Sequence, residues 1–115
     1  MDRIDTLNFP DLSSLSDLTT ADMASGMYKR IQSQINDLLS EINSDEHMLA
    51  TIDNLAITDI GYHNPHILIF YCIDSQGNQV RKLIHINSLN MDLTVYKEQD
   101  FEKSKRPIGF LGEID

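Results

Sequence analysis

His63 and His66 are separated by an Asn-Pro pair, and this is the spacing in the chain that comes closest to a metal or acid–base site. Zinc sites take Cys, His or carboxylate ligands at recurring spacings, and neither a Cys nor a carboxylate stands at such a spacing beside these histidines. His85 lies inside an expected strand, where a histidine either forms a structural hydrogen bond or contacts a ligand. We therefore predict no metal site.

Catalytic groups are equally hard to assemble from this chain. Asp59, Asp74 and Asp92 stand near expected turns and strand ends, where carboxylates cap turns or remain solvated. The glycines are isolated, so no Gly-rich phosphate loop is present, and no nucleophile elbow can be recognised. We expect a protein that is not an enzyme, that has no catalytic residues and that needs no cofactor.

Aromatic, amide and cationic side chains instead suit a binding surface. Aromatic rings can stack on a planar ligand, Asn side chains offer both donors and acceptors, and Arg can bind a phosphate. For Arg106 and the neighbouring Lys105, the alternative is a solvated loop charge. The predicted ligand-binding residues are Tyr62, Asn64, Phe70, Tyr71, Arg81, His85, Asn87 and Arg106.

Length and charge narrow the class of protein. A chain of 115 residues fits one domain and can bury a core without metal or disulfide support. With 18 acidic and 9 basic residues the net charge is −9, which opposes binding to nucleic-acid polymers and to anionic membranes. The single Cys72 lies in an apolar run, so we read it as a small buried side chain of a cytoplasmic protein.

The chain divides into an arm and one domain. Residues 1–19 are rich in Ser, Asp and Thr with scattered Leu and Phe, and they form an N-terminal arm that packs on a neighbouring subunit, packs on its own domain or remains a tail. Residues 20–115 form a single domain. Apolar residues at steps of three and four from Met23 to Ile42 predict an amphipathic helix over 20–44, with Thr20 as its N-cap and a stop at 43–45.

Short apolar or alternating runs after this helix predict strands. They cover 47–52, 55–60, 66–74, 78–86 and 89–96, and residues 107–110 are expected to return to an edge of the sheet. The pair Asp53-Asn54 favours a tight turn. The predicted fold class is α+β, with one amphipathic helix packed on an antiparallel meander of five to six strands.

The hairpin of 66–86 allows a finer prediction. If its turn centres on Gln76, one face carries Leu68, Phe70, Cys72, Val80, Ile84 and Ile86, and the other carries Ile67, Ile69, Tyr71, Arg81, Leu83 and His85. Both faces are apolar toward the Asn-Pro corner. Because one helix covers only one face, the other face requires a second subunit or a ligand.

A set of short motifs resembles a family of small bacterial and phage proteins of unknown function. The motifs are Asp59-Ile60-Gly61-Tyr62-His63-Asn64-Pro65, Ile69-Phe70-Tyr71, Gly77-Asn78, Leu83-Ile84-His85 and Arg106-Pro107-Ile108-Gly109-Phe110, behind a helix with Met27-Tyr28 and Arg30-Ile31. The resemblance covers about residues 24–110. In the family pattern a Gln precedes the positions of His85 and Leu89, where this chain has Ile84 and Ser88. The resemblance implies a compact fold and no particular activity.

Small, acidic phage proteins with a helix and an antiparallel sheet often act as oligomeric sponges, and this chain is similar to them in kind. Such proteins sequester cyclic nucleotides or cyclic ADP-ribose signals of antiviral defence at subunit interfaces. We therefore expect a homo-oligomeric, non-enzymatic binding protein with an anti-defence role and a small nucleotide ligand. The alternative is an acidic inhibitor or adaptor that binds a basic host protein, and a purely structural oligomer is a third possibility.

Overall fold

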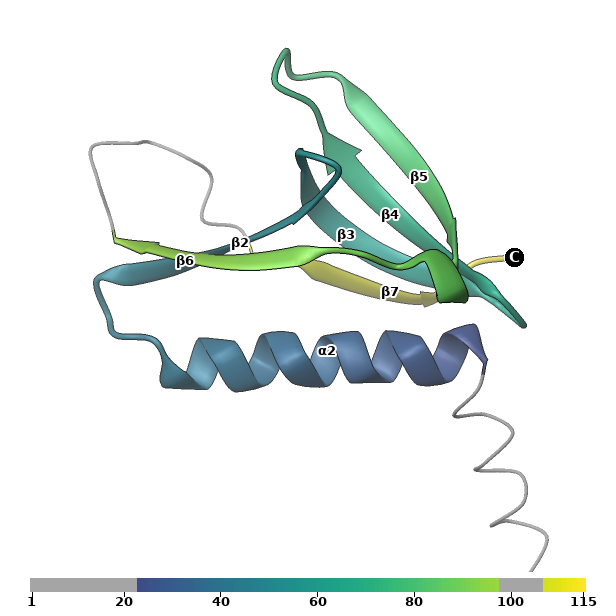
Figure 1. Cartoon of the computed structure of the whole chain (residues 1–115), viewed down its shortest axis with the longest axis horizontal. Coiled ribbons are helices and arrows are strands. Elements are labelled where there is room, and N and C mark those ends of the chain that lie inside the picture. Colours follow the sequence, from purple (N-terminus) through teal and green to yellow (C-terminus); the bar gives the residue numbers. More distant parts are fainter. Residues whose placement is uncertain (1–22, 98–106) are drawn as a thin grey trace, which may run out of the picture.

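A computed structural model describes residues 23–97 and 107–115 of the chain. In these ranges one long helix lies against one face of a six-stranded sheet, which confirms the predicted α+β class (Figure 1). The elements are α2 (Ala24–Glu41), β2 (Glu46–Ile52), β3 (Leu55–His63), β4 (Ile67–Ile73), β5 (Gln79–His85), a 3₁₀ turn (Ile86–Ser88), β6 (Asp92–Lys97) and β7 (Gly109–Glu113). The predicted arm at 1–19 lies outside the described residues.

Helix α2 buries one stripe against the sheet. Tyr28, Ile31 and Ile35 are buried at the expected steps of three and four. Leu39, which belongs to the same sequence pattern, is instead 44% exposed. The helix ends at Glu41, three residues before the predicted end at residue 44, and its N-cap position is Met23. The predicted cap, Thr20, lies outside the described residues.

The corner between β3 and β4 caps the N-terminus of α2. The backbone N–H of Ala24 donates to the carbonyl oxygen of Pro65 at 2.7 Å, and the N–H of Ser25 donates to Asn64 Oδ1 at 3.1 Å. Met23 provides no side-chain cap of its own, so a distant segment satisfies these helix N–H groups. This contact also fixes where the chain leaves the helix toward residue 22.

The sheet is a meander over four strands and then departs from sequence order. β2 to β5 pair as consecutive antiparallel neighbours, whereas β6 pairs with β2 and β7 pairs with β3 in parallel. β2 and β3 pair only at 51–52 with 55–56, next to the Asp53-Asn54 turn, where both residues have positive φ. Beyond residue 56, β3 has no pairing with β2 along this edge. β7 pairs with residues 59–62 of β3 and so provides hydrogen-bond partners there.

The predicted register of the β4–β5 hairpin is confirmed. Leu68 lies opposite Ile84, and Tyr71 lies opposite Arg81, symmetrically about residue 76. The face that contains Leu68, Phe70 and Cys72 packs into the core with α2. Burial raises the pKa of the Cys72 thiol, as expected of a small buried side chain, and nearby Lys82 opposes that rise.

The opposite side of the hairpin, here called the outer face, carries Ile67, Ile69, Tyr71, Arg81 and Leu83. Figure 1 shows α2 running beneath the sheet, with β4 and β5 rising away from it. Leu83 is 63% exposed. Its neighbours on this face, Ile69 and Tyr71, also lie on the side away from α2. The sequence prediction of a second, partly apolar face is therefore realised in the described residues. No helix in the described ranges is long and apolar enough to cross a membrane.

Asp74 organises the turn between β4 and β5. Its Oδ1 accepts the backbone N–H groups of Asn78 at 2.8 Å and Gln76 at 2.9 Å, and Oδ2 accepts Asn78 Nδ2 at 3.3 Å. These hydrogen bonds hold the pKa of the carboxyl below its ordinary value of 3.8. The largest cause is the hydrogen bond from the backbone N–H of Asn78. The turn therefore favours the ionised side chain.

We expect acid to weaken this turn through Asp74. Because the folded pKa is lower than the unfolded pKa, the contribution to stability is complete above the unfolded value and is lost as the pH falls through the folded value. Amide exchange of Gln76 and Asn78, followed between neutral and acidic pH, measures this loss of stability in the turn. Asp74→Asn keeps an acceptor without the titration, so its turn should show a weaker pH dependence. Equal pH dependence in both proteins would contradict the assignment.

Candidate functional site

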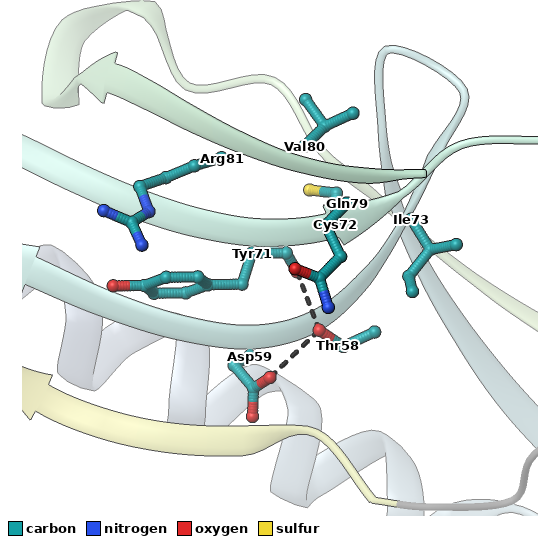
Figure 2. A pocket seen from close by; sticks show the side chains of 8 residues that line it. All are labelled: Thr58, Asp59, Tyr71, Cys72, Ile73, Gln79, Val80 and Arg81. Carbon is teal, nitrogen blue, oxygen red and sulfur yellow. Dashed lines mark hydrogen bonds between the residues drawn. The ribbon is translucent and has the colours of Figure 1, made fainter. Parts of the chain in front are cut away.

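Tyr71 and Arg81 form the centre of the candidate site. They stand opposite each other on β4 and β5, and their side chains both project on the outer face because paired residues share a face. The Arg81 guanidinium carbon lies 4.9 Å from the centroid of the Tyr71 ring, which is a cation–π contact. Figure 2 shows the guanidinium above the phenol ring.

A β-bulge in β3 forms the polar wall beside this pair. The pairing of β3 with β4 shifts between Ile57 and Asp59, so Thr58 is the extra residue. Thr58 Oγ1 contacts the carbonyl oxygen of Tyr71 at 3.1 Å and Asp59 Oδ2 at 2.9 Å (Figure 2). The bulge thereby brings Asp59 opposite Tyr71 on the outer face, which places a carboxylate near a cation and a ring.

The carboxylate of Asp59 also depends on β7. A Cβ atom at Gly109 would overlap Asp59 Oδ1, so a larger residue at this position would displace the Asp59 carboxylate where β7 pairs with β3. The motif containing Gly109 and the motif containing Asp59 are thus in contact, although they are far apart in the sequence. The parallel pairing of β7 is what brings them together.

The resulting cleft has a volume of about 490 Å³. It is lined by Thr58, Asp59, Tyr71, Cys72, Ile73, Gln79, Val80 and Arg81. This volume lies within the range of roughly 300–1,000 Å³ found for small-molecule pockets. A cation, a carboxylate, an amide and an aromatic ring in one cleft can together bind a ligand that has an anionic part, a hydrogen-bonding part and a flat part.

His85 and Asn87 lie at the other end of β5. His85 is four residues from Arg81 on the same strand face, a distance of roughly 13 Å along the strand. Its ring stacks on His66 with centroids 5.2 Å apart, and its Nδ1 accepts the backbone N–H of Asn87 at 3.0 Å. These two predicted ligand residues therefore start the 3₁₀ turn and lie away from the cleft.

Three other predicted residues have structural roles. Phe70 is completely buried in the core, so it cannot stack on a ligand while the protein is folded. Tyr62 packs against Tyr28 with ring centroids 4.9 Å apart, and Asn64 caps α2. The prediction placed these side chains with Tyr71 because of residue type, whereas strand alternation and the corner direct them toward the helix. Arg106 lies outside the described residues.

Sequence reasoning missed Thr58, Asp59 and Gln79 as cleft residues. Gln79 could have been found, because the register that pairs Tyr71 with Arg81 also pairs Ile73 with Gln79. Asp59 could not, since the bulge at Thr58 has no distinct sequence signal here. Within 23–97 and 107–115, no group of three His, Cys, Asp or Glu side chains is arranged to hold a metal ion.

Comparison with known proteins identifies no relative. No protein-family model matches the chain, and neither the curated proteins nor the solved structures include a match. The resemblance of its motifs to small bacterial and phage proteins accordingly stays a prediction, and the chemistry of the cleft carries the functional argument.

Proposed function

We propose that this protein is a non-enzymatic binding protein that takes a small anionic ligand with a planar ring at the Tyr71–Arg81 cleft. The observation that carries the proposal is the Arg81 guanidinium lying over the Tyr71 ring, on the face that α2 does not cover. Within this ligand class we place cyclic nucleotides and cyclic ADP-ribose signals. The biological role proposed is that of a phage anti-defence sponge that sequesters such a signal in the cytoplasm.

The orientation of the ligand follows from the charges in the cleft. The guanidinium carbon of Arg81 lies 4.9 Å from the centroid of the Tyr71 ring, and in this proposal its N–H groups bind phosphate oxygens. Asp59 would repel a phosphate and accept an N–H from a base, which places the base toward β3 and the phosphate toward β5. The side-chain amide of Gln79 supplies a further donor or acceptor between them.

Assembly into a homo-oligomer is part of this proposal. Leu39, Val95 and Leu111 are 44%, 37% and 48% exposed in the single chain, on α2, β6 and β7 respectively. These side chains offer apolar surfaces on which copies could meet. The mass of the assembly is measured in the same experiment as ligand binding.

The alternative function is an acidic inhibitor or adaptor that binds a basic host protein. The net charge of −9 favours it, because a strongly acidic surface attracts a basic partner over a long range. The two functions differ in the residue they require. A nucleotide ligand requires Arg81, whereas an acidic docking surface gains from the removal of any cation.

Native mass spectrometry and calorimetry with cyclic di- and trinucleotides and cyclic ADP-ribose isomers test the proposal. We expect one member of this panel to bind, and Arg81→Ala to weaken it by roughly tenfold or more, as for the loss of a charge-assisted hydrogen bond. Lys82→Ala is the matched control, because this substitution removes the same charge from the adjacent position. The Lys82 ammonium pairs with the Asp53 carboxylate at 2.6 Å and not with Tyr71. A panel without a ligand, or equal losses in both variants, would refute the proposal.

A further inference from the structure

We propose that the segment 7–18 of this same chain binds across the apolar half of the outer face. The site is a groove of about 380 Å³ beside the Asn64-Pro65 corner, formed chiefly by Ile67, Ile69, Leu83 and Ile114. This proposal concerns a different surface chemistry from the ligand cleft and does not depend on nucleotide binding. The two sites adjoin at Tyr71 and Arg81, which border both.

The groove is built as an apolar surface with a fixed wall. Ile67 and Ile69 lie on β4, and Leu83 lies opposite Ile69 on β5. Ile114 closes the β3 side, because its side chain lies over Gly61, where a Cβ would come within 2.8 Å of Ile114 Cγ1. The backbone holds this wall in place: the Ile114 N–H donates to the Tyr62 carbonyl oxygen at 2.7 Å, and His63 Nδ1 lies 2.8 Å from the Ile114 carbonyl oxygen.

The chain leaves the described domain at one end of this groove. The N–H of Ala24 is bonded to Pro65, and Pro65 lies two residues before Ile67, where the groove begins. Leu18 precedes Met23 by only five residues, so an extended chain carries it roughly 17 Å from that point. The distance from Ile67 to Ile69 is about 7 Å, and the step from β4 to β5 is about 5 Å. The segment therefore reaches every part of the groove.

The composition of the segment matches the groove. Residues 7–18 hold five large apolar side chains within twelve positions, and the residues between them are Asn, Pro, Asp and Ser. The apolar side chains are Leu7, Phe9, Leu12, Leu15 and Leu18. A few apolar side chains on a polar chain can cover Leu83, the most exposed large hydrophobic residue of the described ranges, without leaving a continuous apolar surface outside.

Tethering favours the groove of the same chain over that of a second copy. A short linker holds a segment near its site at an effective concentration on the order of millimolar, far above the concentration of separate chains in dilute solution. Since the linker from Met23 reaches the groove of its own domain, the intramolecular contact forms first. A second copy that lends its segment is the competing outcome.

Paramagnetic relaxation in the full-length protein tests the inference. A spin label is attached to Ser14→Cys, while the native Cys72 is buried and its reaction with the label is checked in the unsubstituted chain. We expect loss of amide signal intensity at residues 67–71 and 81–83 and intact signals at 37–41 of α2. Unchanged intensities at 67–71 and 81–83 would overturn the inference.

Two variants and a mixing experiment sharpen the result. Leu83→Ser should restore the lost intensities, whereas Leu39→Ser, which removes an exposed Leu from α2, should leave the losses unchanged. Persisting losses in Leu83→Ser would place the segment elsewhere and overturn the inference. A mixture is then prepared from two kinds of chain, one with the spin label and no ¹⁵N, the other with ¹⁵N and no spin label. The amide signals of the ¹⁵N chains should stay intact. Losses in that mixture would show that a second copy supplies the segment, which also overturns it.

Discussion

Phe70→Ala is expected to lower the free energy of unfolding by about 3–5 kcal/mol, which is the usual cost of truncating a buried aromatic side chain. Phe70 has no exposed surface and lies in the core with Ile35, Ile60 and Leu68. Because single domains are stable by only about 5–15 kcal/mol, this loss is a large fraction of the total. Urea unfolding followed by circular dichroism measures it.

Tyr71→Ala is the matched control for this prediction. Tyr71 is the next residue on β4, but its ring lies on the outer face and its chief described contact is the guanidinium of Arg81. The expected loss is about 1 kcal/mol, as for an exposed cation–π contact. Equal losses in the two variants would contradict the assignment of Phe70 to the core and Tyr71 to the ligand face.

Tyr28→Ala is expected to lower the free energy of unfolding by about 3 kcal/mol and to loosen β7 from the sheet. The Tyr28 ring contacts Tyr62 and Phe110, with centroids 4.9 Å and 5.9 Å away. Its hydroxyl oxygen accepts the backbone N–H of Gly112 at 3.0 Å. One side chain of α2 thus holds the last strand, so its loss should speed amide exchange at 109–114 more than in β4.

Tyr28→Phe separates the ring from the hydroxyl. It keeps both ring contacts and removes the acceptor for Gly112, so we expect a loss of about 1 kcal/mol, the usual net value of one hydrogen bond. Amide exchange should rise chiefly at Gly112. If Tyr28→Phe were as destabilising as Tyr28→Ala, the hydroxyl and not the ring would account for the attachment of β7.

Local pattern was enough to predict the helix and the β4–β5 hairpin. The steps of three and four from Met27 to Ile35 place side chains on one face of a helix whatever surrounds it. Strand alternation about the turn at Gln76 likewise pairs Tyr71 with Arg81. The centre of the candidate site was therefore accessible from sequence, because both residues belong to one hairpin and their register depends on neighbouring residues alone.

The remaining parts of the fold and of the cleft depend on contacts between distant segments. β6 pairs with β2 and not with β5, and β7 pairs with β3, since each fills an unpaired strand edge that no local pattern reveals. The pairing of β7 with β3 places Gly109 beside Asp59, and the bulge at Thr58 in the pairing of β3 with β4 places Asp59 opposite Tyr71. Composition alone could not separate Phe70 from Tyr71 by function, because both are aromatic residues of one strand.

The sequence by itself determined the α+β class, the two faces of the hairpin and the Tyr71–Arg81 pair. These features follow from periodicity, which acts within a few residues. Only the tertiary structure decided that Asn64 caps α2, that Phe70 lies in the core, and that Asp59 joins the cleft. Each of these depends on which distant surface a side chain meets, and packing of the whole chain sets that surface.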